Sequence, residues 1–246
     1  MDLYNLKIIK SGKRLEIYKI NNYAVTTNKE SSNKAGRKGK EEVSKEDKKI
    51  NSLHSRKQTL NNARNNIIRL IKSNEDMQIF ITLTYAKESN YKDSKKHLNN
   101  FFNKLRKDYK SLKYIWILEY GTKNKRLHYH VLTNIEINIK LSTSKERKST
   151  DHKFLEQGFN RKYWPYGFVD IRSLKQEDNT NIALYVACYI TKDLMNLKLN
   201  DYRIYGYSNK TLNKPIIKTY YDSISLEEII QEFKENYNKY NLYQLL

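Results

Sequence analysis

The sequence predicts an α+β fold in which an antiparallel sheet carries helices on one face. Segments 79–85, 114–120 and 127–134 alternate and are rich in Ile, Thr and aromatic residues, which is typical of strands. Between the first two, "SKKHLNNFFNKLRKDY" has apolar residues at helical spacing. The order strand, helix, strand, strand leaves little room for parallel crossovers and therefore favours an antiparallel sheet.

The remaining elements follow from local patterns. Gly121 opens "GTKNKR", a hairpin connection between the second and third strands. The charged segment of roughly 135–163 predicts an exposed insertion. Further elements are a strand over 166–174, a helix over 180–194 and one or two final strands within "RIYGYSN" and "KPIIKTYY", 203–209 and 214–221.

Composition divides the chain into three parts. Residues 1–52 are predicted to be a basic N-terminal extension that ends in a low-complexity linker, about 27–50, because this linker is almost devoid of apolar residues. Residues 53–222 hold the α+β domain. Residues 223–246 predict an amphipathic C-terminal helix that begins with a capping box, Ser225 and Glu228.

The charge balance indicates a polyanionic partner. The 246 residues include 47 Lys and Arg against 27 Asp and Glu, a formal net charge of +20, which favours nucleic acid first and a membrane surface second. The single cysteine, Cys188, excludes an internal disulfide framework and suits a reducing cytosol. No run approaches the roughly 20 apolar residues of a membrane span, and the N-terminus lacks the apolar core of a signal peptide. We therefore expect a soluble protein of the cytoplasm.

Two of the five histidines, His128 and His130, stand one residue apart on the third strand and so share a face. A hairpin that is symmetric about the middle of "GTKNKR" places Glu119 directly opposite His128. Two imidazoles and a carboxylate with open positions suit Mg²⁺ or Mn²⁺ acting on a phosphate better than structural zinc. A half-buried polar pair without a metal remains an alternative for these residues alone.

The helix over 180–194 places Tyr185, Tyr189 and Lys192 at i, i+4 and i+7, on one face. A tyrosine hydroxyl is a poor nucleophile at its ordinary pKa near 10, but a nearby cation helps it to ionise, and a metal that polarises a phosphate adds to the activation. Attack on DNA would give a 5′-phosphotyrosine link and a free 3′-hydroxyl. Tyrosine is abundant here, so chance spacing is the alternative. The apolar stripe of this helix is centred on a different side and consists of Ala183, Val186, Ala187, Ile190 and Leu194.

Three motifs in this order resemble those of the HUH endonucleases, the Rep initiators of rolling-circle replication in small phages and plasmids. They are "FITLTY", "LHYHVL" and "YVACYITK", and "WPYGFVDIRSL" and "YSNKTLNKP" are similar to flanking segments of such initiators. The resemblance covers about residues 55–220. It implies a ferredoxin-like or RRM-like fold, with the histidine strand at the sheet centre and the tyrosine helix beside it.

The resemblance also implies roles for single residues. His128 and His130 match metal ligands, and Glu119 matches the third ligand of some relatives. Tyr189 matches the nucleophile and Lys192 its electrostatic partner. Tyr185 holds the position of a second tyrosine or, in some plasmid initiators, of a glutamate that activates water. Many two-tyrosine members have Lys where this chain has Cys188.

The implied function is that of a replication initiator that nicks and joins single-stranded DNA at an origin, with Mg²⁺ or Mn²⁺ as cofactor. The chain has no phosphate-binding loop of its own, so a host helicase and a host polymerase are the expected partners. Alternatives are a relaxase or transposase with the same chemistry, a non-catalytic RRM-like nucleic-acid-binding module, and a metal-dependent hydrolase with no covalent step. Candidate DNA-binding residues are Arg56, Arg64, Arg69, Thr82, Thr84, Arg126 and Arg172, with Lys104, Arg106 and Lys107 as further cations.

Overall fold

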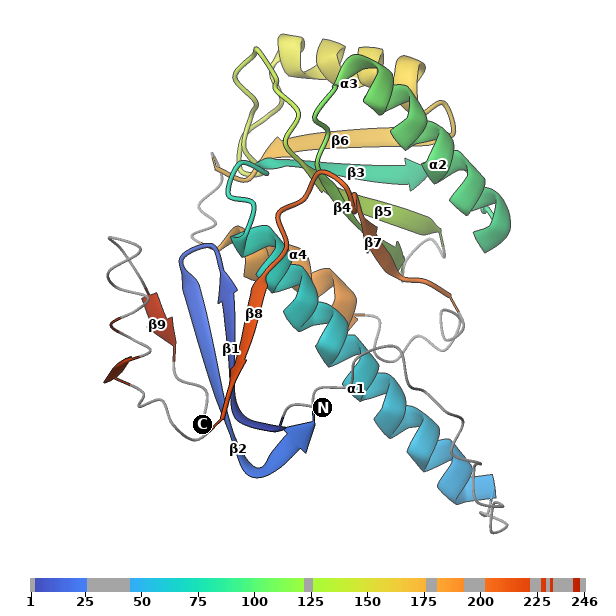
Figure 1. The fold of residues 1–246 in the computed structure, drawn as a ribbon. Coiled ribbons are helices and arrows are strands. Elements are labelled where there is room, and N and C mark those ends of the chain that lie inside the picture. Colours follow the sequence, from blue (N-terminus) through green and yellow to red (C-terminus); the bar gives the residue numbers. More distant parts are fainter. Residues whose placement is uncertain are drawn as a thin grey trace. The chain divides into compact units, whose positions relative to one another are not determined.

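A computed structural model describes residues 3–25, 45–121, 126–175, 181–192, 202–221, 227–228, 231 and 241–243. The chain forms two compact units, His54–Asn213 and the combination of Met1–Leu53 with Lys214–Leu246 (Figure 1). The predicted linker lies outside the described residues as far as residue 44, and from Lys45 the chain is helical. Most of the predicted C-terminal helix also lies outside them. Near its end, Asn241–Tyr243 form a strand rather than helix.

The larger unit is α+β, as the sequence predicts, and is built on a five-stranded antiparallel sheet. The strand order is β6-β3-β5-β4-β7, and every neighbouring pair is antiparallel. The central strand is β5, which carries both histidines. The strands are β3 (Ile79–Tyr85), β4 (Tyr114–Tyr120), β5 (Leu127–Thr133), β6 (Gly167–Ser173) and β7 (Tyr205–Tyr207).

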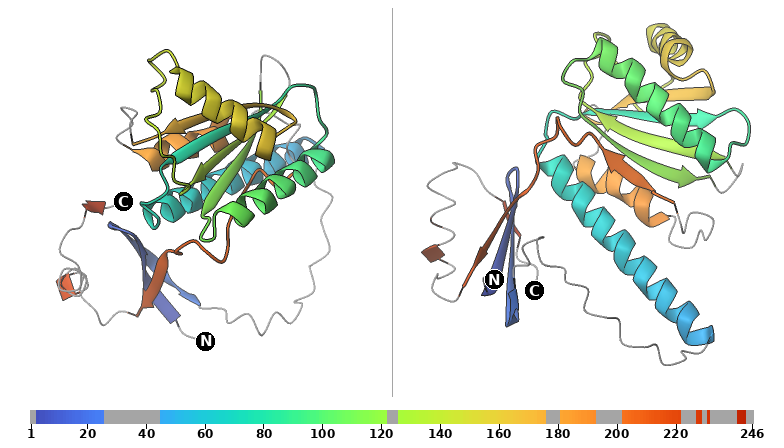
Figure 2. Two further views of the ribbon diagram at one scale, coloured as in Figure 1. Left: turned by 90° about the horizontal axis from the view of Figure 1, so that it is seen from above. Right: turned by 45° about the vertical axis from the view of Figure 1, so that its right-hand side comes forward.

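Helices cover both faces of this sheet, so the expectation of helices on one face was wrong (Figures 1 and 2). On one side, α2 (Tyr91–Asp108) and α3 (Thr150–Tyr163) share a core with alternate strand residues such as Ile81. On the other, α1 (Lys45–Lys72) and α4 (Ile182–Lys192) share a second core with the intervening residues, such as Phe80. The physical reason lies in β4, where five consecutive residues are buried, so both faces are apolar and both need cover.

The segment 135–163 is not an exposed insertion, because its C-terminal half is α3. His152, Phe159 and Tyr163 are buried on this helix. The helix begins where the hydroxyl of Ser149 accepts a hydrogen bond from the backbone N–H of His152. The apolar positions were there at helical spacing, but the many charged residues around them hid the pattern.

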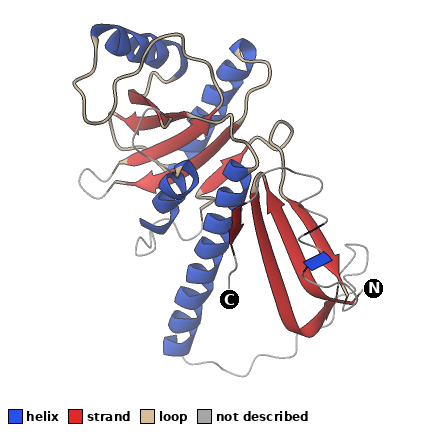
Figure 3. Cartoon of the chain, turned by 90° about the vertical axis from the view of Figure 1, so that its left-hand side faces the viewer, coloured by secondary structure: helices blue, strands red, loops and turns tan. Residues whose placement is uncertain are grey.

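The smaller unit contains a second sheet, of order β8-β1-β2-β9 (Figure 3). Its elements are β1 (Leu3–Ser11), β2 (Arg14–Val25), β8 (Ile216–Tyr220) and β9 (Asn241–Tyr243). β1 and β2 form a hairpin that was not predicted within the N-terminal extension. Its two-residue turn has Gly12 at φ 57°, a left-handed conformation that glycine adopts without a steric penalty. None of the described helices is long and apolar enough to cross a membrane.

Candidate active site

Four side chains from four strands form a row across the sheet face that α1 and α4 cover in part. Residues that lie directly opposite in antiparallel strands share a face, with Cβ atoms about 4.5–5.5 Å apart. The register β6-β3-β5-β4 therefore places in one row Phe168, Thr84, His128 and Glu119. The predicted pairing of Glu119 with His128 is confirmed.

Glu119 makes its short contact with the other histidine. Its Oε2 lies 2.6 Å from Nε2 of His130, which stands one row further along β5. The side chain of His130 is only 7% exposed and that of Glu119 is 22% exposed, so this polar contact is shielded from water. A carboxylate–imidazole pair in such surroundings fixes the orientation of both groups.

The two threonines of β3 hold the opposite edges of the imidazole rings. Thr82 Oγ1 lies 3.2 Å from Nδ1 of His130, and Thr84 Oγ1 lies 3.0 Å from Nδ1 of His128. The Nε2 atom of each ring is thereby left to face the site. Next to Nε2 of His128 lies Gly121, where an added Cβ would come within 2.7 Å of that atom. The threonines, predicted as DNA-binding residues, thus contact the histidines directly.

The helix α4 brings the two tyrosines onto the same face. Its buried residues are small or β-branched, which lets it lie close to the sheet. The ring of Tyr189 packs on the imidazole of His130, with centroids 4.0 Å apart, and Phe80 contacts both rings at 5.6 Å. The Tyr189 hydroxyl donates a hydrogen bond to the Tyr185 hydroxyl over 3.0 Å. The candidate nucleophile and the candidate metal ligands therefore meet.

The local electrostatics disfavour a free tyrosinate and a free imidazolium. Burial raises the pKa of Tyr189 well above its ordinary value, and the hydrogen bond to Tyr185 raises it further. Burial lowers the pKa of His128, with His130 and Arg126 acting in the same direction and Glu119 against them. His128 is thus held neutral, the form that binds a metal, whereas Tyr189 needs a nearby cation to ionise.

The chemistry of these donors fits a hard divalent cation. Each imidazole has its Nδ1 at a hydroxyl and turns its Nε2 toward the site, the arrangement that usually accompanies histidine ligation. The Glu119 carboxylate supplies the oxygen donor. In the described part of the chain, however, no three His, Cys, Asp or Glu side chains are arranged to hold a metal. The direct Glu119–His130 contact would have to open to admit one.

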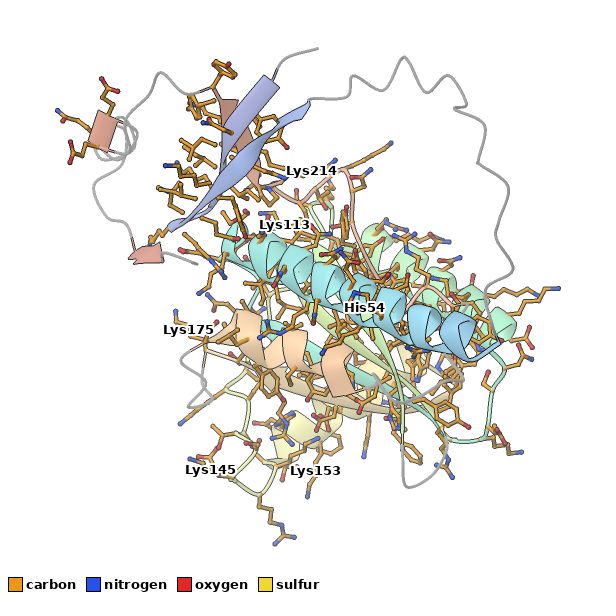
Figure 4. All side chains as sticks on the ribbon, turned by 90° about the horizontal axis from the view of Figure 1, so that it is seen from below. His54, Lys113, Lys145, Lys153, Lys175 and Lys214 are labelled. Carbon is orange, nitrogen blue, oxygen red and sulfur yellow. The ribbon has the colours of Figure 1, made fainter. Side chains whose placement is uncertain are left out.

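The predicted cations are spread over several elements and differ in their surroundings. On α1, three arginines are half-buried, namely Arg56, Arg64 and Arg69. Arg126 donates to the Tyr85 carbonyl over 3.5 Å. Arg172 pairs with Asp170 and also donates to the Ser142 carbonyl. Lysines such as Lys145 and Lys153 add exposed charge elsewhere (Figure 4). Lys192 ends α4, and its side chain is outside the described part of the structure.

Comparisons with known proteins point to replication. Residues 78–194 match a family model described as that of the replication-associated protein ORF2, a segment that includes both histidines, Glu119 and both tyrosines. The chain is similar to Replication-associated protein ORF2 of Spiroplasma virus 4, with 31% identity over 139 residues. That alignment covers 50% of this chain and 41% of the viral protein, so the chain spans about two fifths of the length of this curated relative. No solved structure matches significantly.

Proposed function

We propose that this chain is a rolling-circle replication initiator that nicks and joins single-stranded DNA through a 5′-phosphotyrosine intermediate on Tyr189. The observation that carries the proposal is the packing of Tyr189 on His130, the histidine that is paired with Glu119. It places a hydroxyl nucleophile beside a set of metal-binding donors on one sheet face. The similarity to replication-associated proteins over residues 78–194 supports the same role.

In the nicking step, Tyr189 Oη attacks the phosphorus of the scissile phosphodiester. The new bond joins phosphorus to Oη, and the bond between phosphorus and the 3′ oxygen breaks. The tyrosine proton leaves along the hydrogen bond to the Tyr185 hydroxyl and on to solvent, and the 3′ oxygen takes a proton from solvent. Joining is the reverse, because a 3′-hydroxyl attacks the phosphotyrosine and releases Tyr189.

The other site residues prepare this step. His128, His130 and Glu119 would hold Mg²⁺ or Mn²⁺, which supplies Lewis-acid polarisation of the scissile phosphate. Thr82 and Thr84 keep the two imidazoles oriented. Lys192, one turn after Tyr189, would stabilise the tyrosinate. The free 3′-hydroxyl would then prime a host polymerase, with unwinding by a host helicase.

The test is the formation of a covalent DNA adduct. The purified protein is incubated with a labelled single-stranded DNA pool and Mn²⁺, and adducts that survive SDS are counted. We expect an adduct in the wild type that is lost in Tyr189→Phe and in His128→Ala. Tyr202→Phe is the matched control, because Tyr202 is an exposed tyrosine that stacks on Tyr91. Tyr185→Phe shows whether the first step needs the second tyrosine.

The alternatives give different results in the same assay. A non-catalytic RRM-like module would bind DNA and form no adduct with any metal. A metal-dependent hydrolase would cleave DNA equally well with Tyr189→Phe. A relaxase or transposase would form the same adduct, and the preferred DNA sequence and neighbouring genes would distinguish it from an initiator.

A further inference from the structure

Phe168 is an exposed aromatic residue on an otherwise covered strand. Its side chain is 63% exposed, and within the seven residues of β6 it alone is exposed. A single exposed apolar residue is common on protein surfaces and needs no explanation by itself. The location of this one gives it significance.

The ring lies on the same sheet face as the candidate active site. Phe168 is directly opposite Thr84, and Thr84 is directly opposite His128, whose Nδ1 its hydroxyl contacts. With neighbouring strands about 4.8 Å apart, Phe168 lies roughly 10 Å from His128 along the row. A nucleotide next to the scissile phosphate can reach the ring.

The charges around Phe168 are compatible with a phosphate backbone. The one acidic side chain of β6, Asp170, is neutralised by Lys148 at 2.6 Å and by Arg172 at 3.0 Å. Lys148 also contacts Glu156 at 2.6 Å, so these four side chains have no net charge. Arg126, at the beginning of β5, adds positive charge at the same end of the sheet, since it donates to the Tyr85 carbonyl.

We propose that Phe168 forms a base-stacking subsite, which seats the base of a nucleotide adjacent to the scissile phosphate of single-stranded DNA. The identity of the ligand rests on the proposed function. An exposed ring binds any base through its π-face, and stacking is tolerant of sequence. The subsite would hold the strand so that the scissile phosphate lies at Tyr189.

The test measures DNA binding without cleavage. All variants carry Tyr189→Phe and are studied in EDTA, so that neither nicking nor metal binding contributes. Binding of a fluorescein-labelled oligo-dT is followed by anisotropy. We expect Phe168→Ala to weaken binding between about 5-fold and 100-fold, the range for loss of one stacked base. Phe168→Trp should retain affinity, and its added indole fluorescence should be quenched by the DNA.

Phe154→Ala is the matched control, because Phe154 is 64% exposed but lies on α3. It should leave oligo-dT binding unchanged. A second probe is an oligonucleotide of equal length without bases, for which Phe168→Ala should have no effect. An equal effect on both probes, or equal behaviour of Phe154→Ala and Phe168→Ala, would overturn the stacking proposal. In particular, unchanged binding in Phe168→Ala would point to a protein partner or a second copy of the chain at this ring.

The two proposals fail separately. If the parent protein with an intact Tyr189 forms no adduct, the nicking function is wrong even when Phe168→Ala weakens DNA binding. If the adduct forms and Phe168→Ala binds as tightly as its parent, only the stacking subsite is wrong.

Discussion

The carboxylate of Glu119 lies 2.6 Å from Nε2 of His130, the histidine diagonal to it, although His128 is the residue directly opposite in the ladder. This contact joins two strands at the most buried point of the candidate site. It also brings the only carboxylate of the proposed ligand set against the imidazole on which Tyr189 packs.

Removing the charge of Glu119 should separate its chemical role from its structural role. Glu119→Gln keeps a side-chain oxygen for His130 but loses the anionic ligand, so we expect loss of adduct and of Mn²⁺ binding with little change in stability. Glu119→Ala leaves the imidazole of His130 without this partner and should also cost about 1–3 kcal/mol of the free energy of unfolding. Isothermal titration with Mn²⁺ and thermal unfolding measure the two effects. Glu136→Gln, at an exposed glutamate, should change neither quantity.

The hydroxyl of Thr84 should support metal binding without touching the metal. Thr84→Val keeps the shape of the side chain but removes the contact with Nδ1 of His128. We expect Mn²⁺ affinity to fall by about 10- to 100-fold, as is usual when the hydrogen-bond partner of a ligating histidine is lost. Thr84→Ser should restore it, and Thr219→Val, at an exposed threonine of β8, should have no effect. Equal Mn²⁺ affinity in the valine and serine variants would argue against this role.

Two glycines should respond to alanine in opposite directions. At Gly167 an added Cβ would collide with the Thr84 carbonyl oxygen and the Ala86 nitrogen, both backbone atoms, so Gly167→Ala should destabilise the fold by about 1–3 kcal/mol. Gly158 lies within α3, and nothing lies within 4 Å of its added Cβ. Gly158→Ala should therefore stabilise the fold by about 0.5–1 kcal/mol. Urea unfolding of both variants checks the signs, and a stable Gly167→Ala protein would contradict the packing at β6.

His97 should make stability depend on pH. Burial lowers its pKa below the ordinary value near 6.5, with Lys96 acting in the same direction and Asp93 against it, while Tyr166 stacks on the ring and Tyr85 contacts Nδ1. The unfolded chain then binds more protons than the folded one between the lowered pKa and about 6.5. The free energy of unfolding is therefore fully expressed above about pH 6.5 and falls as the pH drops below it.

The measurement compares wild type with His97→Gln in denaturant unfolding from about pH 7 down to about pH 5. The variant should lose less stability over this range, because the contribution of His97 is absent while the other histidines are unchanged. A parallel decline in both proteins would show that His97 does not titrate differently in the folded state.

The elements that sequence predicts well here are those with a local period. The strands over 79–85, 114–120 and 127–134 and the helix after the first strand follow from alternation and from helical spacing. The pairing of Glu119 with His128 follows from the symmetry of a single short hairpin. The β1–β2 hairpin was equally local, with Gly12 between two alternating segments, but the basic composition obscured it.

The sequence by itself determined the residue types of the site, its faces and one register, since strand alternation and helix periodicity are properties of neighbouring residues. Tertiary structure decided the rest. It placed β6 beside β3 and thereby Phe168 in the row of His128, and it packed Tyr189 on His130. It also turned the Glu119 carboxylate toward the diagonal histidine. These are contacts between segments far apart in the chain or choices between neighbouring partners, and both depend on how two helix layers close over a sheet that is apolar on both faces.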